Sequence, residues 1–291
     1  MNVKVGKNVR KLRGAKNTAR PPGRDVGAAT ISDTKLFPTT EFPHLKSYTV
    51  GGVQVSCVDP TLAVDIFFQL ALSRIGGYIA VRDANGIVES QKDTRLRDII
   101  NSARMTLPDG MPIVWIGKLK NVPVQRVTGV KFVESVMSDP RARQIKHYFY
   151  GGQMENTSRV VALARKLLGE NAVAGWHVPP IRPSGTIEDN SVIAQIAATQ
   201  PNIIWVGLST PKQEYWMANH TAHFPNTILV GVGAAFDFIA GTRRRAPVFI
   251  QRIGCEWLFR VIQEPKRLLP RYMRVVPGML KILITEAVRR R

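Results

Sequence analysis

The chain has 291 residues, enough to bury a sizeable core as one large domain or two small ones. Its two cysteines, Cys57 and Cys255, show no metal-ligand or CxxC spacing, which argues against a structural zinc site and indicates reduced thiols in a cytosolic protein. The sequence has neither the apolar run of a signal peptide nor a stretch near the roughly 18 apolar residues of a transmembrane helix. We therefore expect a chain that stays in the cytoplasm.

The formal net charge is +20, and its distribution along the chain is uneven. Residues 1–24 carry eight Lys or Arg and no acidic residue, and residues 243–291 carry thirteen basic and three acidic residues. Residues 25–242 are nearly neutral, with twenty basic and eighteen acidic side chains. This pattern predicts terminal segments that meet a polyanion, either nucleic acid or an anionic membrane surface.

The first segments of the chain predict an arm, a hairpin and a helix. Residues 1–27 combine many Lys and Arg with a Pro-Pro-Gly break, which predicts a disordered basic arm. Residues 47–58 predict a β-hairpin with a Gly-Gly turn. A helix should follow, opened at Asp59, continuing to Arg74 and closed by the glycine pair at 76–77.

Polar residues then follow two predicted strands. The sequence predicts a strand at 78–86, a helix at 87–103 and a short second strand at 105–107. Asp83 and Asn85 come at the end of the first strand and Asp109 at the end of the second, so a parallel sheet would bring them to one edge. Two simpler interpretations stay open, because Pro-Asp-Gly is a favoured turn and Asp83 with Asn85 can cap a helix. Arg126, between two apolar stretches, is equally compatible with a solvated face.

A strand at 146–150 runs into Gly151-Gly152 and then into an amphipathic helix at 156–168. Asn156 or Thr157 would cap this helix. A strand, two glycines and a helix start can cradle a phosphate, although the same arrangement is a common tight turn.

Further alternation predicts strands at 171–178 and 202–208 around a helix at 189–200. Strands separated by helices over this length indicate an α/β fold with a doubly wound, mostly parallel, Rossmann-like sheet. The small hairpin would precede it and a basic helical appendage would follow it. We expect three parts: the arm at 1–27, a catalytic domain at 28–245 and a membrane-associating segment at 246–291.

The loop at 209–214 begins another helix and has two interpretations. Thr210 and Gln213 match a capping box, with Pro211 at the first helical position. Lys212, beside free backbone N–H groups, would instead favour a phosphate. Residues 271–291 alternate apolar runs with Arg and Lys, which predicts either an interfacial helix or an amphipathic helix docked on the core.

Taken together, a series of motifs resembles the WecG/TagA/CpsF family of bacterial glycosyltransferases over roughly Gly76 to Arg274. These motifs are, in order, PDGMPIVW, QRVTG, YFYGG, VGLSTPKQEYW, GVGAAFDFIAG, RRAP, EWLFR and EPKR. The resemblance implies transfer of an N-acetylmannosamine-type sugar or glucose from a UDP-sugar to a polyprenyl-diphosphate-linked acceptor in surface polysaccharide synthesis. It also implies inversion, no metal or other cofactor, and a peripheral location on the inner face of the cytoplasmic membrane.

The resemblance also assigns roles to residues. Asp109 matches the family's proposed base, which would take a proton from the acceptor hydroxyl. Without a metal, cations and helix starts must stabilise the leaving UDP. The candidates for contacts with the substrates are Asp83, Asn85, Arg126, Gly151, Gly152, Lys212, Gln213, Gly231, Gly233, Asp237, Arg267, Arg271 and Arg274.

Two other classes of function compete with this interpretation. The net charge suggests a nucleic-acid-binding protein, but the excess lies in the termini and no zinc-finger, RRM or helix-turn-helix signature occurs, so no nucleic-acid partner is expected. A dinucleotide-dependent oxidoreductase would need G-x-G-x-x-G, and Phe236 stands at the third glycine's position after Gly231 and Gly233.

Overall fold

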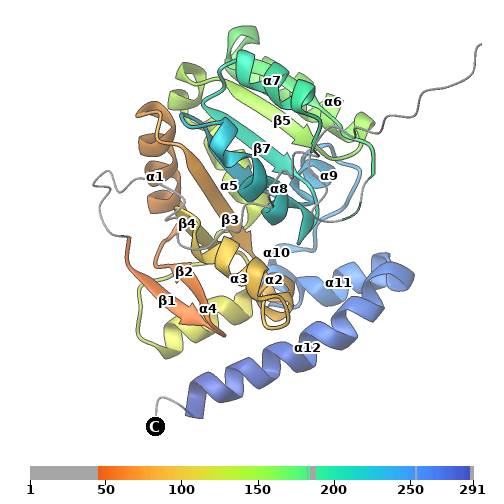
Figure 1. Cartoon of the computed structure of the whole chain (residues 1–291). Coiled ribbons are helices and arrows are strands. Elements are labelled where there is room, and N and C mark those ends of the chain that lie inside the picture. The colour runs from red at the N-terminus through yellow and green to blue at the C-terminus, as the bar shows by residue number, and fades with distance from the viewer. Residues whose placement is uncertain (1–44, 182, 184–187, 253, 289–291) are drawn as a thin grey trace, which may run out of the picture. The chain divides into compact units, whose positions relative to one another are not determined.

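A computed structural model describes residues 45–181, 183, 188–252 and 254–288 (Figure 1). The predicted basic arm at 1–27 lies outside the described residues. The described residues all belong to one compact unit.

The centre of this unit is a parallel sheet of six strands. In spatial order, the strands are β4 (Met105–Pro108), β3 (Gly77–Arg82), β8 (Ile228–Gly231), β7 (Ile203–Gly207), β5 (His147–Gly151) and β6 (Val173–His177). Most of these strands are buried along their whole length, as expected for a sheet covered on both faces. The predicted Rossmann-like α/β fold is therefore confirmed.

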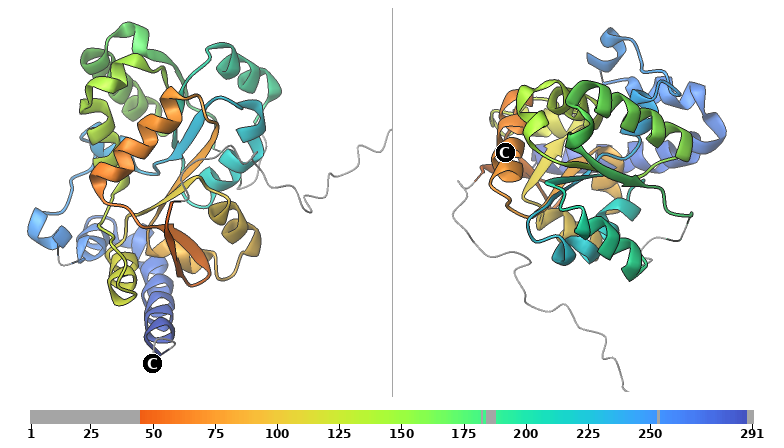
Figure 2. Two further views of the ribbon diagram at one scale, coloured as in Figure 1. Left: turned by 90° about the vertical axis from the view of Figure 1, so that its left-hand side faces the viewer. Right: turned by 90° about the horizontal axis from the view of Figure 1, so that it is seen from above.

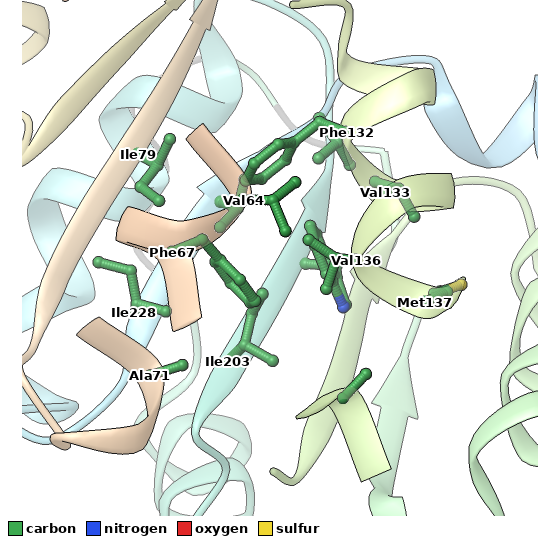
Figure 3. Close-up of a cluster of buried hydrophobic side chains, with 14 of the residues drawn as sticks. Val64, Phe67, Ala71, Ile79, Phe132, Val133, Val136, Met137, Ile203 and Ile228 are labelled. Atoms are coloured by element: carbon green, nitrogen blue, oxygen red, sulfur yellow. The ribbon is translucent and has the colours of Figure 1, made fainter. Parts of the chain in front are cut away.

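Helices cover both faces of the sheet (Figure 2). One face carries α1 (Pro60–Leu72), α5 (Gly129–Ser138) and α6 (Met154–Leu168), and the other carries α3 (Thr94–Asn101), α7 (Asn190–Ala198) and α8 (Lys212–His220). Under α1, the Phe67 ring lies 5.7 Å from both Phe132 and Trp205, between centroids. Figure 3 shows this cluster, in which Ile79 and Ile203 pack from the strands. Aromatic contacts of this kind pack the helices of this face against the sheet.

The predicted hairpin is present, with β1 (Ser47–Val50) antiparallel to β2 (Val53–Ser56). Gly51 and Gly52 both have positive φ, +54° and +82°, as the two-residue turn that matches strand twist requires. The remaining helical elements are α2 (Ala84–Glu89), α4 (Met111–Leu119), η1 (Pro140–Gln144), η2 (Glu170–Ala172), η3 (Thr221–His223), α9 (Ala235–Ile239), α10 (Val248–Arg252), α11 (Glu256–Gln263) and α12 (Pro265–Val288).

The ends of α1 show one prediction confirmed and one wrong. Asp59 caps the helix, because its Oδ1 accepts a hydrogen bond from the Leu62 N–H at 2.9 Å. The glycine pair does not close it: the helix ends at Leu72, Arg74 adopts the left-handed conformation, and Gly77 already belongs to β3. Gly76 has a different function, since a Cβ there would lie 2.1 Å from the Pro225 carbonyl oxygen.

Two other helix predictions need correction. The helix expected at 87–103 is divided into α2 and α3, because Asp93 caps α3 by accepting from the Leu96 N–H at 2.9 Å. The helix after Gly151-Gly152 begins at Met154, not at Asn156 or Thr157, whose side chains make other bonds. Thr157 Oγ1 donates to the Gly151 carbonyl at 2.7 Å.

The C-terminal helix α12 docks on the core, where it packs against α2 and α4 (Figure 1). Val275, Met279 and Ile282 are buried in this contact. At its far end Glu286 pairs with Lys120 at 2.7 Å and accepts from the Gly51 N–H at 3.3 Å. No described helix is long and apolar enough to cross a membrane. The docked alternative is thus realised, while contact with a membrane remains a prediction.

Candidate active site

A cavity of about 440 Å³ opens at the carboxyl ends of β3, β4 and β8 and is bordered by α4, α11 and α12. Among the described residues that line it are six arginines and three carboxylates. The carboxylates are Asp83, Asp109 and Glu256, and the arginines are Arg126, Arg243, Arg245, Arg260, Arg267 and Arg271. The excess of positive charge favours an anionic ligand.

Asp109 lies directly after β4, where its backbone N–H donates to the Arg82 carbonyl at 2.8 Å. Its side chain remains 28% exposed and faces the cavity. Burial, helped by the neighbouring carboxylates of Asp83 and Glu256, raises the pKa of Asp109 to about 6, against the opposing effect of the Arg126 charge. A carboxyl group with such a pKa is well placed to accept a proton near neutral pH.

Arg126 connects the end of β4 to the C-terminal helices. Its Nε donates to the Asp109 carbonyl, and its Nη2 lies 3.5 Å from Asp109 Oδ1. The same Nη2 donates to Glu256 Oε2 at 2.8 Å, and Nη1 donates to the Gln251 carbonyl at 3.3 Å. Arg126 is therefore held between the predicted base and α11, and it does not lie on a solvated face.

Glu256 was not among the predicted site residues, although it belongs to the EWLFR motif. One signal could have identified it: it is one of only three acidic residues in the strongly basic segment 243–291. Its side chain is 17% exposed and lies against Arg126.

Asp83 and Asn85 follow β3 and both line the cavity. Asp83 also caps α2, because its Oδ1 accepts from the Gly86 N–H at 2.9 Å. A Cβ on Gly110 would lie 3.2 Å from the Ala84 nitrogen, so the Pro-Asp-Gly turn packs closely against this cap. The turn and the cap are thus real, and both present their polar side chains to the cavity.

Gln213 is buried beneath the cavity and its amide is held at both ends. Its Oε1 accepts from the Gly233 N–H at 2.9 Å, and its Nε2 donates to Glu214 Oε1 at 2.8 Å. The predicted capping box is wrong: α8 has no side-chain cap among the described residues, and Thr210 Oγ1 donates to Glu214 Oε1 at 3.3 Å. The long-range bond to Gly233 takes the place of the local one.

Glu214 is a second residue that sequence reasoning did not single out. It forms a buried ion pair with Arg82 from the end of β3, with side chains 1% and 0% exposed. Arg82 Nε and Nη1 and Glu214 Oε2 have no hydrogen-bond partner within the described part of the chain. This pair lies behind Gln213 and joins β3 to α8.

Five of the candidate residues do not line the cavity. Lys212 is half-buried at the start of α8, and Arg274 is exposed on α12. Asp237 is engaged by Asn156 Nδ2 at 2.8 Å and by Arg243 Nε at 3.2 Å. The other two, Gly151 and Gly152, form a tight turn, since a Cβ on Gly152 would lie 2.5 Å from Thr157 Oγ1. The cavity is lined instead by Gly231, Gly233, Arg267 and Arg271 from the predicted set, together with the residues described above.

The arginines of the C-terminal helices lie close enough to repel one another. Burial and the charges of Arg243, Arg260 and Arg271 lower the pKa of Arg267, while Glu264 opposes this effect. Arg267 Nε also pairs with Glu264 Oε2 at 2.5 Å. A group of like charges beside a cavity is costly unless an anion neutralises it.

The sequence pattern of the glycosyl transferase WecG/TagA/CpsF family matches residues 48–291. The chain belongs to this family. It is similar to an N-acetylglucosaminyldiphosphoundecaprenol N-acetyl-beta-D-mannosaminyltransferase of Bacillus spizizenii, with 27% identity over 194 residues, which cover 66% of this chain and 73% of the relative. A protein of the same name from Bacillus subtilis is 28% identical over 196 residues, 67% of this chain and 74% of the relative. This WecG/TagA/CpsF member is therefore a glycosyltransferase, and the cavity with Asp109 is its candidate active site.

Proposed function

We propose that this glycosyltransferase moves an N-acetylmannosamine-type sugar or glucose from a UDP-sugar to a polyprenyl-diphosphate-linked acceptor in surface polysaccharide synthesis. The observation that carries the proposal is a carboxyl group of raised pKa in a cavity lined by arginines. The names of both Bacillus relatives support an acceptor of this kind.

The proposed reaction is a single displacement with inversion at the anomeric carbon. The acceptor hydroxyl oxygen attacks that carbon while the bond from the carbon to the UDP oxygen breaks, and the hydroxyl proton passes to Asp109. Arg126 stays paired with Glu256 at 2.8 Å, which holds its charge beside the reacting groups. The arginines of α11 and α12 offset the charge that develops on the leaving UDP.

The proposal includes attachment to an anionic membrane surface through the C-terminal helices. Among the described residues, the outward side of α11 and α12 exposes large apolar side chains: Ile262, Leu269, Met273, Ile284 and Val288. Basic residues lie between them, including Lys266, Arg274 and Lys281. An amphipathic surface of this composition suits the boundary between head groups and acyl chains.

The test is UDP release from a panel of UDP-sugars with a polyprenyl-diphosphate-sugar acceptor, in the presence of EDTA. We expect acceptor-dependent turnover that collapses in Asp109→Asn, with an unchanged circular dichroism spectrum as the control for folding. Equal turnover by Asp109→Asn would refute the role of Asp109 and leave the enzyme class intact. Absence of turnover by the wild type with every sugar nucleotide would refute the proposed substrates.

A further inference from the structure

The candidate active-site cavity has two chemically different ends. Near β4 it is bordered by Asp109 and Arg126, whereas between α4 and α12 its lining is apolar. We define the α4–α12 trough as the apolar part, lined by Trp115 of α4 and by Val275, Val276, Met279, Leu280 and Leu283 of α12. The sugar and the diphosphate of a nucleotide sugar are polar and gain little from such an apolar surface.

The side of α12 that faces the cavity changes from cationic to apolar along the helix. Arg267 and Arg271 come first, and the trough residues follow at spacings of three and four, which places them on one face. At 1.5 Å per residue, the distance from Arg271 to Leu283 is about 18 Å along the axis. This face therefore offers a site for a charged group next to an extended apolar path.

The trough is an open surface with a buried floor. Val275 and Met279 form the floor and are each 3% exposed, whereas Trp115, Val276 and Leu280 at the rim are 43%, 42% and 55% exposed. Such exposed rims beside a cationic site indicate a binding groove and not a sealed core. The helix that forms one wall is fixed at its far end by the bond between Glu286 and Lys120.

We propose that the α4–α12 trough binds the first isoprene units of the polyprenyl chain of the acceptor, while the attached diphosphate lies beside Arg267 and Arg271. This inference rests on the proposed function and adds a lipid-binding groove to it. The complementarity is specific: a diphosphate joined directly to a hydrocarbon chain matches arginines joined directly to an apolar groove.

The experiment compares the binding of farnesyl diphosphate and isopentenyl diphosphate, measured by isothermal titration calorimetry without detergent or lipid. The two probes share a diphosphate and differ in the length of the apolar chain. We expect the wild type to bind farnesyl diphosphate at least about tenfold more tightly, because only the longer chain buries apolar surface in the trough. Leu280→Gln should remove most of this preference and leave the affinity for isopentenyl diphosphate unchanged.

Ile284→Gln is the matched control. Ile284 lies one turn further along α12 and is 57% exposed, as Leu280 is 55% exposed, but it does not line the cavity. Ile284→Gln should leave the affinities for farnesyl diphosphate and isopentenyl diphosphate unchanged. The proposed role of the trough would be overturned if both variants lost the preference for farnesyl diphosphate equally, or if the wild type bound the two probes with equal affinity. If the wild type still turned over a polyprenyl acceptor in that case, the proposed function would stand without a lipid-binding role for the trough. Binding of neither probe would overturn both the trough and the adjoining diphosphate site.

Discussion

The buried ion pair between Arg82 and Glu214 allows a quantitative prediction. Replacing Glu214 with Gln removes the charge and keeps an oxygen that can accept from Gln213 and Thr210. The guanidinium group of Arg82, whose side chain is 0% exposed, is then left without a counter-charge. Breaking a buried pair in this way costs about 3 to 5 kcal/mol of the free energy of unfolding.

Urea denaturation followed by circular dichroism measures this loss. Arg82→Met should cost a similar amount, because it leaves the Glu214 carboxylate buried and unpaired. The double variant Arg82→Met with Glu214→Gln should lose less than either single variant, since no buried charge remains. A loss below about 1 kcal/mol in Glu214→Gln, or a double variant that loses the sum of the two, would refute this reasoning.

Replacing Glu214 with Met should also reduce activity, because it removes the oxygen to which the Gln213 amide donates. Glu214 Oε1 holds the Gln213 amide, and the other end of that amide accepts from the Gly233 N–H, two residues after β8. We therefore expect Glu214→Met to lower kcat more than Glu214→Gln, which keeps the acceptor, at temperatures at which both variants remain folded. Unchanged kcat with a reduced stability would show that the pair acts on the fold alone.

Three further predictions follow from the contacts around the cavity. Because the pKa of Asp109 is raised to about 6, kcat/KM should rise as the pH increases through about 6. The fold disfavours the charged form of Asp109, so thermal unfolding should show Asp109→Asn to be more stable than the wild type above that pH. This advantage should disappear toward pH 4, where the carboxyl group is protonated in the wild type. Glu256→Gln removes the charged partner of Arg126 and should lower kcat/KM about tenfold in the UDP-release assay. The control Glu170→Gln, at an exposed glutamate that does not line the cavity, should leave kcat/KM unchanged. Gly152→Ala should destabilise the fold by about 2 kcal/mol or more in a urea titration, because φ is +76° and the added Cβ would lie 2.5 Å from Thr157 Oγ1. Gly169 also has a positive φ, but a Cβ there would have nothing within 4 Å, so the control Gly169→Ala should cost about 1 kcal/mol.

The sheet could be predicted because its strands are short apolar runs separated by helical segments. The hairpin was equally accessible, since a Gly-Gly pair between alternating strands specifies its turn. The division between α2 and α3 was missed because Asp93 lies inside a pattern that also suits one long helix. Its second oxygen accepts from the Tyr215 hydroxyl at 2.5 Å, a contact across 122 residues that no local pattern contains.

Part of the site could be predicted because the order of parallel strands determines which strand ends lie together. Asp83 and Asp109 follow neighbouring parallel strands, so topology alone brings them to one edge. Arg126 and Glu256 are 130 residues apart, and Arg82 and Glu214 are 132 apart. Opposite charges in a single sequence do not reveal which of them pair across such distances. The capping box at Thr210 and Gln213 failed for the converse reason, because a tertiary bond to Gly233 outcompeted the local one.

The C-terminal helices and the cavity depend on each other electrostatically. The sheet edge supplies the carboxyl group of Asp109 and one arginine, Arg126, whereas the other lining arginines come from residues 243–271. Burial lowers the pKa of Arg267, and the repulsion between these charges lowers it further. The bond from Arg126 to Glu256 ties α11 to the sheet edge. An anionic substrate in the cavity would relieve the repulsion and so favour the docked position of these helices. By linkage, any contact that holds α12 in place, including the bond from Glu286 to Lys120, must then also favour binding of the anion.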